Sequence, residues 1–390
     1  MRAIEKIAIL SVSILTIIAT AALGPALGLI SHQFPSASPL LIKSIVTLPA
    51  LICIPISYFS NDLAKFISKK NLIIIGTILY LIGGVSAYFT TNIYFLLGTR
   101  AILGLGLGVV ASLSLVLIGD FFEGKERAKF TGFSTSTSNL GAVIGILLVG
   151  YLGTINWRYI FFVYLIALIV LVLVVMFLPN KKEEQVASAN DDTKNIKFNK
   201  SVFKYSIIVI LAFMVFYSIP TNIALFMGYK HLGSSEMSGL LIALLTFSGF
   251  LFGLNFGRLL KIFGEKLILL AFTLMTIGVL VVGFAPSLLV IIIGVMLVGF
   301  GFGLSVPYSI FHASKIVHAK HTGRAITIVT TSIYVGVSIS PMVLDSLAKL
   351  LHVNNMVGSF YGAAILGVIA ILFSLYVIFG GNKKNEAVAA

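Results

Sequence analysis

Charged side chains inside apolar stretches are the first candidates for chemistry in this 390-residue sequence. Arg100 stands about two turns inside such a stretch, where a guanidinium costs at least ~2.5–3.5 kcal/mol to insert into hydrocarbon. The group must therefore face a protein interior or water. Two interpretations stay open. The charge binds substrate anions or responds to protonation of a nearby acid, or it binds backbone carbonyls near a break at Gly24 and Pro25.

Carboxylates in apolar stretches are rarer still. Only Asp120 and Asp345 lie within them, both near an end, and Glu236 begins another stretch at its outer side. Proton coupling requires a carboxylate whose protonation responds to its surroundings. Asp345, four residues after Pro341, is the candidate that we prefer for this role. The alternative is a solvated acid at a helix end, and His32 or His312 could titrate instead near neutral pH.

Enzyme chemistry has no support in the sequence. There is no P-loop pattern for ATP, no Cys/His cluster with metal-ligand spacing and no acid pair for hydrolysis. The alternating glycines at 104, 106 and 108 lie within an apolar helix and do not follow a strand, so they do not indicate a dinucleotide site. The single cysteine, Cys53, cannot form an internal disulfide. We expect no catalytic residue, no cofactor and no metal.

Composition assigns the chain to the membrane. It is 58% hydrophobic and 10% charged, with a mean hydropathy of +1.08, whereas soluble chains are nearer half apolar and a quarter charged. The net charge of +14 could suggest nucleic-acid binding. However, the Lys and Arg residues lie mostly in short segments between apolar stretches, which is typical of a cytoplasmic membrane face. The expected partner is a lipid bilayer, and nucleic acid is excluded.

Twelve stretches are long enough to cross ~30 Å of hydrocarbon, which takes roughly 20 apolar residues. Their uninterrupted apolar runs favour helices over barrel strands, which would alternate. The first stretch exceeds a signal-peptide core, so we interpret it as a retained helix. The predicted spans are 7–30, 39–60, 71–91, 94–120, 130–153, 157–179, 203–229, 236–257, 266–285, 287–312, 324–347 and 357–380.

The basic residues orient these spans. They gather in alternate loops and at both ends of the chain, which predicts that both termini are cytoplasmic. The one long polar stretch separates six spans from six and reads as a flexible inner linker. We therefore predict an N-terminal six-helix bundle at 1–179, a linker at 180–202 and a C-terminal bundle with a short tail at 203–390.

An internal repeat relates the two halves. A shift of 195 residues places Pro25 on Pro220 and Gly141 on Gly336, and it superposes glycines 104, 106 and 108 on glycines 299, 301 and 303. Two halves with the same orientation imply a pseudo-twofold axis along the membrane normal. The site is then expected near the midplane, where rocking of one half against the other opens it to each side in turn.

Several motifs resemble those of the major facilitator superfamily, and the resemblance covers nearly the whole chain. Helix 4 contains Arg100-x-x-x-Gly104-x-Gly106, similar to the family pattern R-x-x-x-G-x-G. Residues 61–70 are similar to its loop G-x-L-x-D-R-x-G-R-K, with Lys65 in the acidic position and the basic pair Lys69-Lys70 kept. In the family that acid helps to lock the inner gate, so this part of the mechanism differs here.

Helices 5 and 11 carry the motif that resembles the drug and metabolite exporters of that family. Gly141-x-x-x-Gly145 is followed by Ile146 where the exporter motif has proline, and the repeat partner beginning at Gly336 keeps that proline as Pro341. Arg127 stands in an E-R pair like the family's signature before helix 5, and Trp157-Arg158 resembles its W-R pair. The resemblance implies a twelve-helix drug:proton antiporter fold.

Candidate site residues follow from polarity and position. A salt bridge between Asp120 and the Lys65, Lys69 and Lys70 loop is predicted to form when the inner side is closed. The prolines of helices 1 and 7 mark the expected gating pair. The candidates for substrate contact or coupling are Arg100, Asp345, Tyr217, Asn222, Asn139 and Thr20, and those for gating are Asp120, Lys65, Lys69, Lys70, Arg127, Gly141, Gly145, Gly336, Pro341, Pro25 and Pro220.

The leading hypothesis is a monomeric, multi-pass plasma-membrane transporter that exports small amphipathic compounds in exchange for protons. Its 30 Phe and 14 Tyr residues would suit an aromatic cavity. One alternative is uptake or exchange of a metabolite, such as an organic anion held by Arg100. Another is a lipid-handling or sensory membrane protein that transports nothing.

Overall fold

The computed structural model describes residues 2–64, 66–122, 124–179, 201–317, 322–353 and 355–389. Within these ranges the secondary structure is helical and contains no strand. Twelve helical spans are long and apolar enough to cross a membrane. The predicted all-α fold with twelve transmembrane helices is thus confirmed, and the span boundaries agree with prediction to within a few residues, with two exceptions. The fifth span begins seven residues later than predicted, at Thr137, and the ninth begins ten residues earlier, with α10.

Polar side chains start the helices of the N-terminal half. Ser38 accepts a hydrogen bond from the Leu41 amide and precedes Pro39, a residue suited to a first helical position. Asn92 caps the fourth span in the same way. The elements of this half are α1 (Ala3–Ala21), η1 (Gly24–Ala26), α2 (Leu27–Gln33), α3 (Pro39–Leu63), α4 (Lys69–Val85), η2 (Ser86–Phe89), α5 (Ile93–Phe121), α6 (Gly124–Ile155), η3 (Trp157–Leu165) and α7 (Ile166–Phe177).

The C-terminal half repeats this order of six spans. Ser234 caps its second span by accepting a hydrogen bond from the Met237 amide. Its elements are α8 (Ser201–Lys230), α9 (Ser235–Leu254), α10 (Phe256–Phe263), η4 (Gly264–Lys266), α11 (Leu267–Gly283), α12 (Leu288–Lys315), α13 (Thr322–Leu350) and α14 (Asn355–Ala389). The predicted linker falls almost entirely on residues 180–200, outside the described ranges, so the domain boundaries stay a prediction.

The two repeat-related prolines behave differently. The first span breaks at Pro25 into α1, η1 and α2, whereas α8 continues through Pro220. A proline in a helix removes one backbone donor. In α8 the side chains of Thr221 and Asn222 donate to the carbonyls of Tyr217 and Ser218, one turn earlier in the helix. The two helices therefore differ at their prolines, and the gating role of both stays a prediction.

Glycines place the fourth span of each half against its neighbours. A Cβ built on Gly106 would collide with the carbonyl of Gly76 in α4, and one on Gly301 would collide with the carbonyl of Ala271 in α11. Gly104 likewise approaches α3, and its repeat partner Gly299 approaches α9. Small residues allow such close helix contact in membranes. The sequence repeat is thus matched by equivalent packing in both halves.

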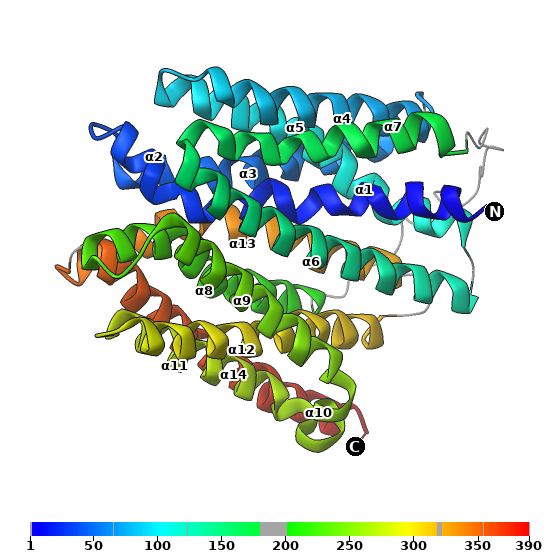
Figure 1. Cartoon of the computed structure of the whole chain (residues 1–390). Helices are drawn as coiled ribbons and strands as arrows, with labels where there is room; N and C mark the ends of the chain where they lie inside the picture. Colours follow the sequence, from blue (N-terminus) through cyan, green and yellow to red (C-terminus); the bar gives the residue numbers. More distant parts are fainter. Residues whose placement is uncertain are drawn as a thin grey trace.

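The two groups of six spans meet at one end of the molecule and separate toward the other, where both chain termini lie (Figure 1). We call the end with the termini the inner end, following the distribution of basic residues, and the opposite end the outer end. Contacts between the halves run mainly from α6 to α9 and from α3 to α13. We call the surface formed by these contacts, together with those of η1 and α2 with α8, the outer seam.

Candidate functional site at the outer seam

Backbone contacts close the outer seam. A Cβ on Gly24 would lie 2.8 Å from the Pro220 carbonyl oxygen, and one on Gly28 would lie 3.1 Å from that of Ala224. The Pro25 carbonyl oxygen accepts a hydrogen bond from Ser235 Oγ at 3.0 Å. The first and seventh spans therefore touch directly beside their prolines, as expected for a gating pair, although their movement stays a prediction.

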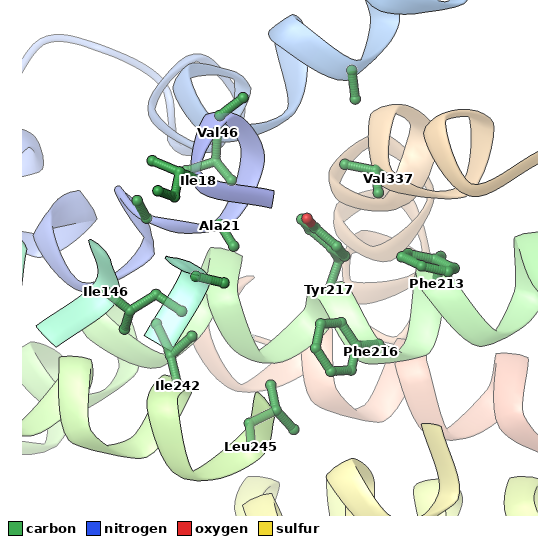
Figure 2. Close-up of a cluster of buried hydrophobic side chains, with 14 of the residues drawn as sticks. Ile18, Ala21, Val46, Ile146, Phe213, Phe216, Tyr217, Ile242, Leu245 and Val337 are labelled. Atoms are coloured by element: carbon green, nitrogen blue, oxygen red, sulfur yellow. The ribbon is translucent and has the colours of Figure 1, made fainter. Parts of the chain in front are cut away.

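The fifth and eighth spans form the second part of the outer seam. A Cβ built on Gly150 in α6 would lie 3.4 Å from the Cα atoms of both Glu236 and Gly239 in α9. Toward the centre, Ile146 of α6 and Ile242 of α9 are both fully or almost fully buried and point into one apolar cluster (Figure 2). Ile146 stands where the exporter motif has proline, so an apolar contact between the halves replaces that residue here.

Aromatic side chains of α8 belong to the same cluster (Figure 2). Phe216 stacks on Phe302 with ring centroids 3.9 Å apart, and Phe213 meets the same ring edge-on at 4.9 Å. Tyr217 donates a hydrogen bond to Thr20 Oγ1 at 3.1 Å. Because Thr20 belongs to α1 and Tyr217 to α8, two of the predicted substrate residues meet across the halves.

A buried ion pair crosses the outer seam from α3 to α13. Lys43 Nζ contacts Asp345 Oδ1, and the two residues are 1% and 5% exposed. Ser359 of α14 donates to the same carboxylate oxygen at 2.9 Å and lies 3.3 Å from Lys43 Nζ. The alternative of a solvated helix-end acid is wrong, because Asp345 is enclosed between three helices.

Sequence reasoning placed Lys43 within a span but did not pair it with Asp345. A signal was present. Lys43 is the only charged side chain in the membrane part of its span, and Asp345 is the only carboxylate in the membrane part of its own. Both stand between one and two helical turns from the outer end of their helices. Equal depth and opposite charge could have suggested the pair, but only the fold shows that α3 and α13 are neighbours.

Arg100 is fully buried within the N-terminal half. Its Nη2 atom donates to the carbonyl oxygens of Gly83 and Gly84 at 2.8 and 3.1 Å. The guanidinium carbon lies 4.8 Å from the Tyr164 ring and 5.4 Å from that of Phe161. The expected carbonyl partners near Gly24 and Pro25 were therefore wrong, because the side chain extends to the end of α4.

Ion pairs near the inner end join helices of the same half. Lys69 Nζ lies 2.8 Å from Asp120 Oδ2, and Lys6 Nζ lies 3.0 Å from Glu126 Oε1. The predicted bond between Asp120 and the basic loop thus exists, but its expected dependence on closure of the inner side is wrong. Both partners belong to the N-terminal half, so the bond forms while the inner ends of the halves are apart.

The remaining candidates support packing within a half. Gly141 and Gly145 of α6 face Ile14 and Ile18 of α1, and Gly336 of α13 faces Ile210 and Phe213 of α8. Their roles in gating stay predictions. Lys70 donates a hydrogen bond to the Val175 carbonyl, and the buried Asn222 donates to Ser218 O and Thr221 Oγ1. Asn139 is half-buried, and Pro341 lies inside α13. Lys65 and the side chain of Arg127 lie outside the described residues.

In the part of the chain that the structure describes, no three His, Cys, Asp or Glu side chains gather as a metal site would require. A hollow of about 570 Å³ lies between α11 and α14, away from the outer seam, and its lining includes the apolar residues Leu280, Phe284 and Ile365.

Comparison with known proteins gives one family. A family model described as Major Facilitator Superfamily matches residues 9–341 and, in a second match, 206–389. The chain is 24% identical to the multidrug efflux pump SdrM of Staphylococcus aureus, over 80% of this chain and 77% of that protein. It is also 24% identical to the probable nitrate transporter NarT of Staphylococcus epidermidis, over 88% and 86%. A match to the multidrug transporter MdtP of Bacillus subtilis, at 26% identity, spans 40% of this chain and 28% of that protein.

Solved structures share the fold. A bacterial homologue of the human lysosomal transporter Spinster, in an inward-facing and occupied conformation, superposes with a TM-score of 0.76 at 14% identity, covering 95% of this chain and 96% of that one. The D-xylose–proton symporter gives 0.72 at 19% identity, covering 95% of each.

Proposed function

The chain belongs to the Major Facilitator Superfamily, and from that premise we propose that it exports small amphipathic compounds from the cell in exchange for protons. As a member of this family it is a membrane transporter and not an enzyme. The family itself argues against a sensory or lipid-handling protein that transports nothing. The direction of transport, the substrate class and the coupling ion are the proposed features.

The observation that carries this proposal is a cluster of aromatic side chains on α8 and α12. Phe213 and Phe216 pack on Phe302, and the neighbouring Tyr217 contacts Thr20 of the N-terminal half. Compounds with an apolar body and one polar group fit such a surface, because aromatic faces attract both apolar groups and cations. An exporter takes up its substrate from the inner side, so the substrate must reach this cluster from the inner end.

The deeply buried charges are engaged with protein groups. Arg100 is sealed between aromatic rings and bound to carbonyls, and Lys43 is paired with Asp345. This arrangement weakens the alternative of an organic anion held by Arg100, because the guanidinium is fully buried inside the N-terminal half. One observation favours uptake or exchange of an anion, namely the similarity of most of the chain to a probable nitrate transporter.

Proton coupling requires a titratable group in the region that changes between states. Among the described residues, Asp345 is the only carboxylate that is buried between the halves in the outer seam. We therefore propose it as the coupling residue. The basic inner loops favour a plasma-membrane protein with both termini in the cytoplasm, and the expected monomer is part of the same proposal.

The test is transport by protein reconstituted in liposomes that contain a pH-sensitive dye. Ethidium and tetraphenylphosphonium represent aromatic cations, and nitrate represents anions. We expect the cations, and not nitrate, to elicit proton movement. Loss of stacking in Phe216→Ala should raise the half-saturating cation concentration about fivefold, since an aromatic pair contributes ~1 kcal/mol. Phe247→Ala, on the exposed face of α9, is the matched control and should leave it unchanged.

Three results would contradict the proposal. Counterflow of nitrate without proton movement would establish anion exchange. Cation flux that does not depend on the proton gradient would show that transport is not coupled to protons. Equal effects of the Phe216 and Phe247 substitutions would show that the aromatic cluster does not bind the substrate.

A further inference from the structure

Two apolar hollows lie next to each other on the outer part of the C-terminal half. The first, of about 570 Å³, is lined by α11, α14 and the end of α13, and the second, of about 440 Å³, is lined by α11 and Val290 of α12. Leu280 and Phe284 of α11 line both. Because Phe284 is 69% exposed, its ring forms a ridge between the two hollows.

The first hollow has the depth of the outer leaflet. Its lining along α11 extends from Thr276 to Phe284, and eight helical residues span about 12 Å. One leaflet contributes about half of the ~30 Å of hydrocarbon. Behind the hollow α11 and α14 are in close contact (Figure 1), since a Cβ on Gly367 would collide with Thr276 Oγ1. Helix packing therefore fixes the floor, and lining residues such as Val368 of α14 stay exposed to lipid.

Basic side chains border the outer rim of the first hollow. Leu351 and Val353, in the turn after α13, belong to its lining. The exposed His352 stands between them with a φ of 53°, and its amide donates to the carbonyl of the exposed Lys349 at 3.1 Å. Lys and Arg are scarce on the outer side of a membrane protein. The segments that border the hollows, 276–290 and 346–369, contain no Asp or Glu, so the rim favours an anion.

We propose that this surface binds one anionic diacyl phospholipid of the outer leaflet. One acyl chain occupies each hollow, on either side of Phe284, and the phosphate lies near Lys349 and His352. The ring of Tyr361 packs against Phe284 with centroids 5.0 Å apart, and tyrosine is a residue type enriched where lipid headgroups begin. The inference goes beyond the proposed export and does not depend on it.

A second copy of the chain is the rival occupant of this surface. A symmetric contact through the hollows would bring the two Lys349 residues to the same level in the membrane. No Asp or Glu of the bordering segments could pair with them. The basic rim and the division into two hollows therefore favour a two-chain anionic lipid over a dimer.

The test measures lipid binding to the full-length protein in detergent by native mass spectrometry. Dioleoyl-phosphatidylglycerol is the anionic probe, and dioleoyl-phosphatidylcholine has the same chains with a zwitterionic headgroup. We expect one phosphatidylglycerol to bind with a dissociation constant about fivefold lower than that of phosphatidylcholine, because Lys side chains near the surface attract anionic headgroups. The anionic lipid should also cause the larger rise in melting temperature.

The rim is tested by Lys349→Gln combined with His352→Asn, since asparagine also tolerates a positive φ. This variant should bind phosphatidylglycerol no more tightly than phosphatidylcholine. Lys230→Gln, which removes another exposed lysine of the outer side, is the matched control and should keep the parental preference.

The first hollow is tested by Val368→Trp, whose side chain would fill it. Both lipids should bind about tenfold more weakly, because part of one acyl chain loses its apolar burial. Leu168→Trp is the matched control. Leu168 and Val368 are each 48% exposed and stand eleven residues into the sixth span of their own half. The control should bind both lipids as the parent does.

Three outcomes would overturn the proposal. Equal affinity of the parent for the two lipids, or a preference that survives loss of Lys349 and His352, would remove the anionic headgroup. Equal effects of the two tryptophan substitutions would show that lipid only solvates this surface. A dimer that Val368→Trp dissociates would identify a second copy as the occupant. No transport is measured, so a failure of the export proposal leaves the lipid site standing, and the reverse also holds.

Discussion

At the residue scale, burial decides what the charged groups can do. Arg100 is the residue whose role changed most between sequence and structure. Its guanidinium donates hydrogen bonds to the carbonyls of Gly83 and Gly84 and lies against the rings of Phe161 and Tyr164. An arginine in this setting stabilises the end of α4 and the packing of η3, and it is shielded from solutes.

Replacement of Arg100 by Ala should therefore affect stability before it affects transport. It removes two charge-assisted hydrogen bonds and leaves a cavity, which together cost about 2–4 kcal/mol. Thermal unfolding in detergent should show a clear fall in the melting temperature, whereas Arg158→Ala, which loses one 3.3 Å contact with the Thr90 carbonyl, should show a smaller one. A stable Arg100→Ala protein that no longer transports would instead place the guanidinium in substrate binding.

At the element scale, glycine position sets how closely helices approach. The fourth span of each half carries glycines at equivalent places, and each faces a neighbouring backbone. Gly98, in the same helix as Gly106, has nothing within 4 Å of the place where a Cβ would stand. One helix thus provides both a crowded and an open glycine in otherwise similar surroundings.

We expect Gly106→Ala to destabilise the protein by about 1–3 kcal/mol, because α5 must move away from α4 to admit the methyl group. Gly301→Ala should do the same in the other half. Gly98→Ala should be neutral or slightly stabilising, since alanine has the higher helix propensity by up to ~1 kcal/mol. Unfolding followed by circular dichroism measures all three. Equal melting temperatures for Gly98→Ala and Gly106→Ala would contradict the packing argument.

At the scale of the whole molecule, the two halves form one closed end and one parted end. Transport by alternating access requires that the closed end open during each cycle. Gly28 and Ala224 face each other at this end from opposite halves. A Cβ on Gly28 would lie 3.8 Å from that of Ala224, which is the mean separation in disulfides.

The pair Gly28→Cys with Ala224→Cys should therefore form a disulfide under mild oxidation and stop transport. Reduction should restore it, and each single variant should be insensitive to oxidant. Flux through the oxidised and fully cross-linked protein would show that the outer seam does not open in the cycle.

The sequence by itself determined the class, the number of spans, the motif-bearing helices and the duplication. These features depend on local hydropathy and on residue spacing along one helix, as in Arg100-x-x-x-Gly104 or the glycines of the fourth and tenth spans. Lipid enforces them because each span must satisfy its backbone internally and bury its charges. For that reason the buried state of Arg100 could also be anticipated.

The tertiary structure alone decided which side chains meet. Lys43 and Asp345 are separated by 302 positions in the chain, and Thr20 and Tyr217 by 197. No local pattern encodes such contacts. They arise because α3 packs against α13 and α1 against α8 only when two complete six-helix groups come together. The same packing pairs Lys69 of α4 with Asp120 of α5, since helix neighbours follow from packing and cannot be deduced from the order of loops.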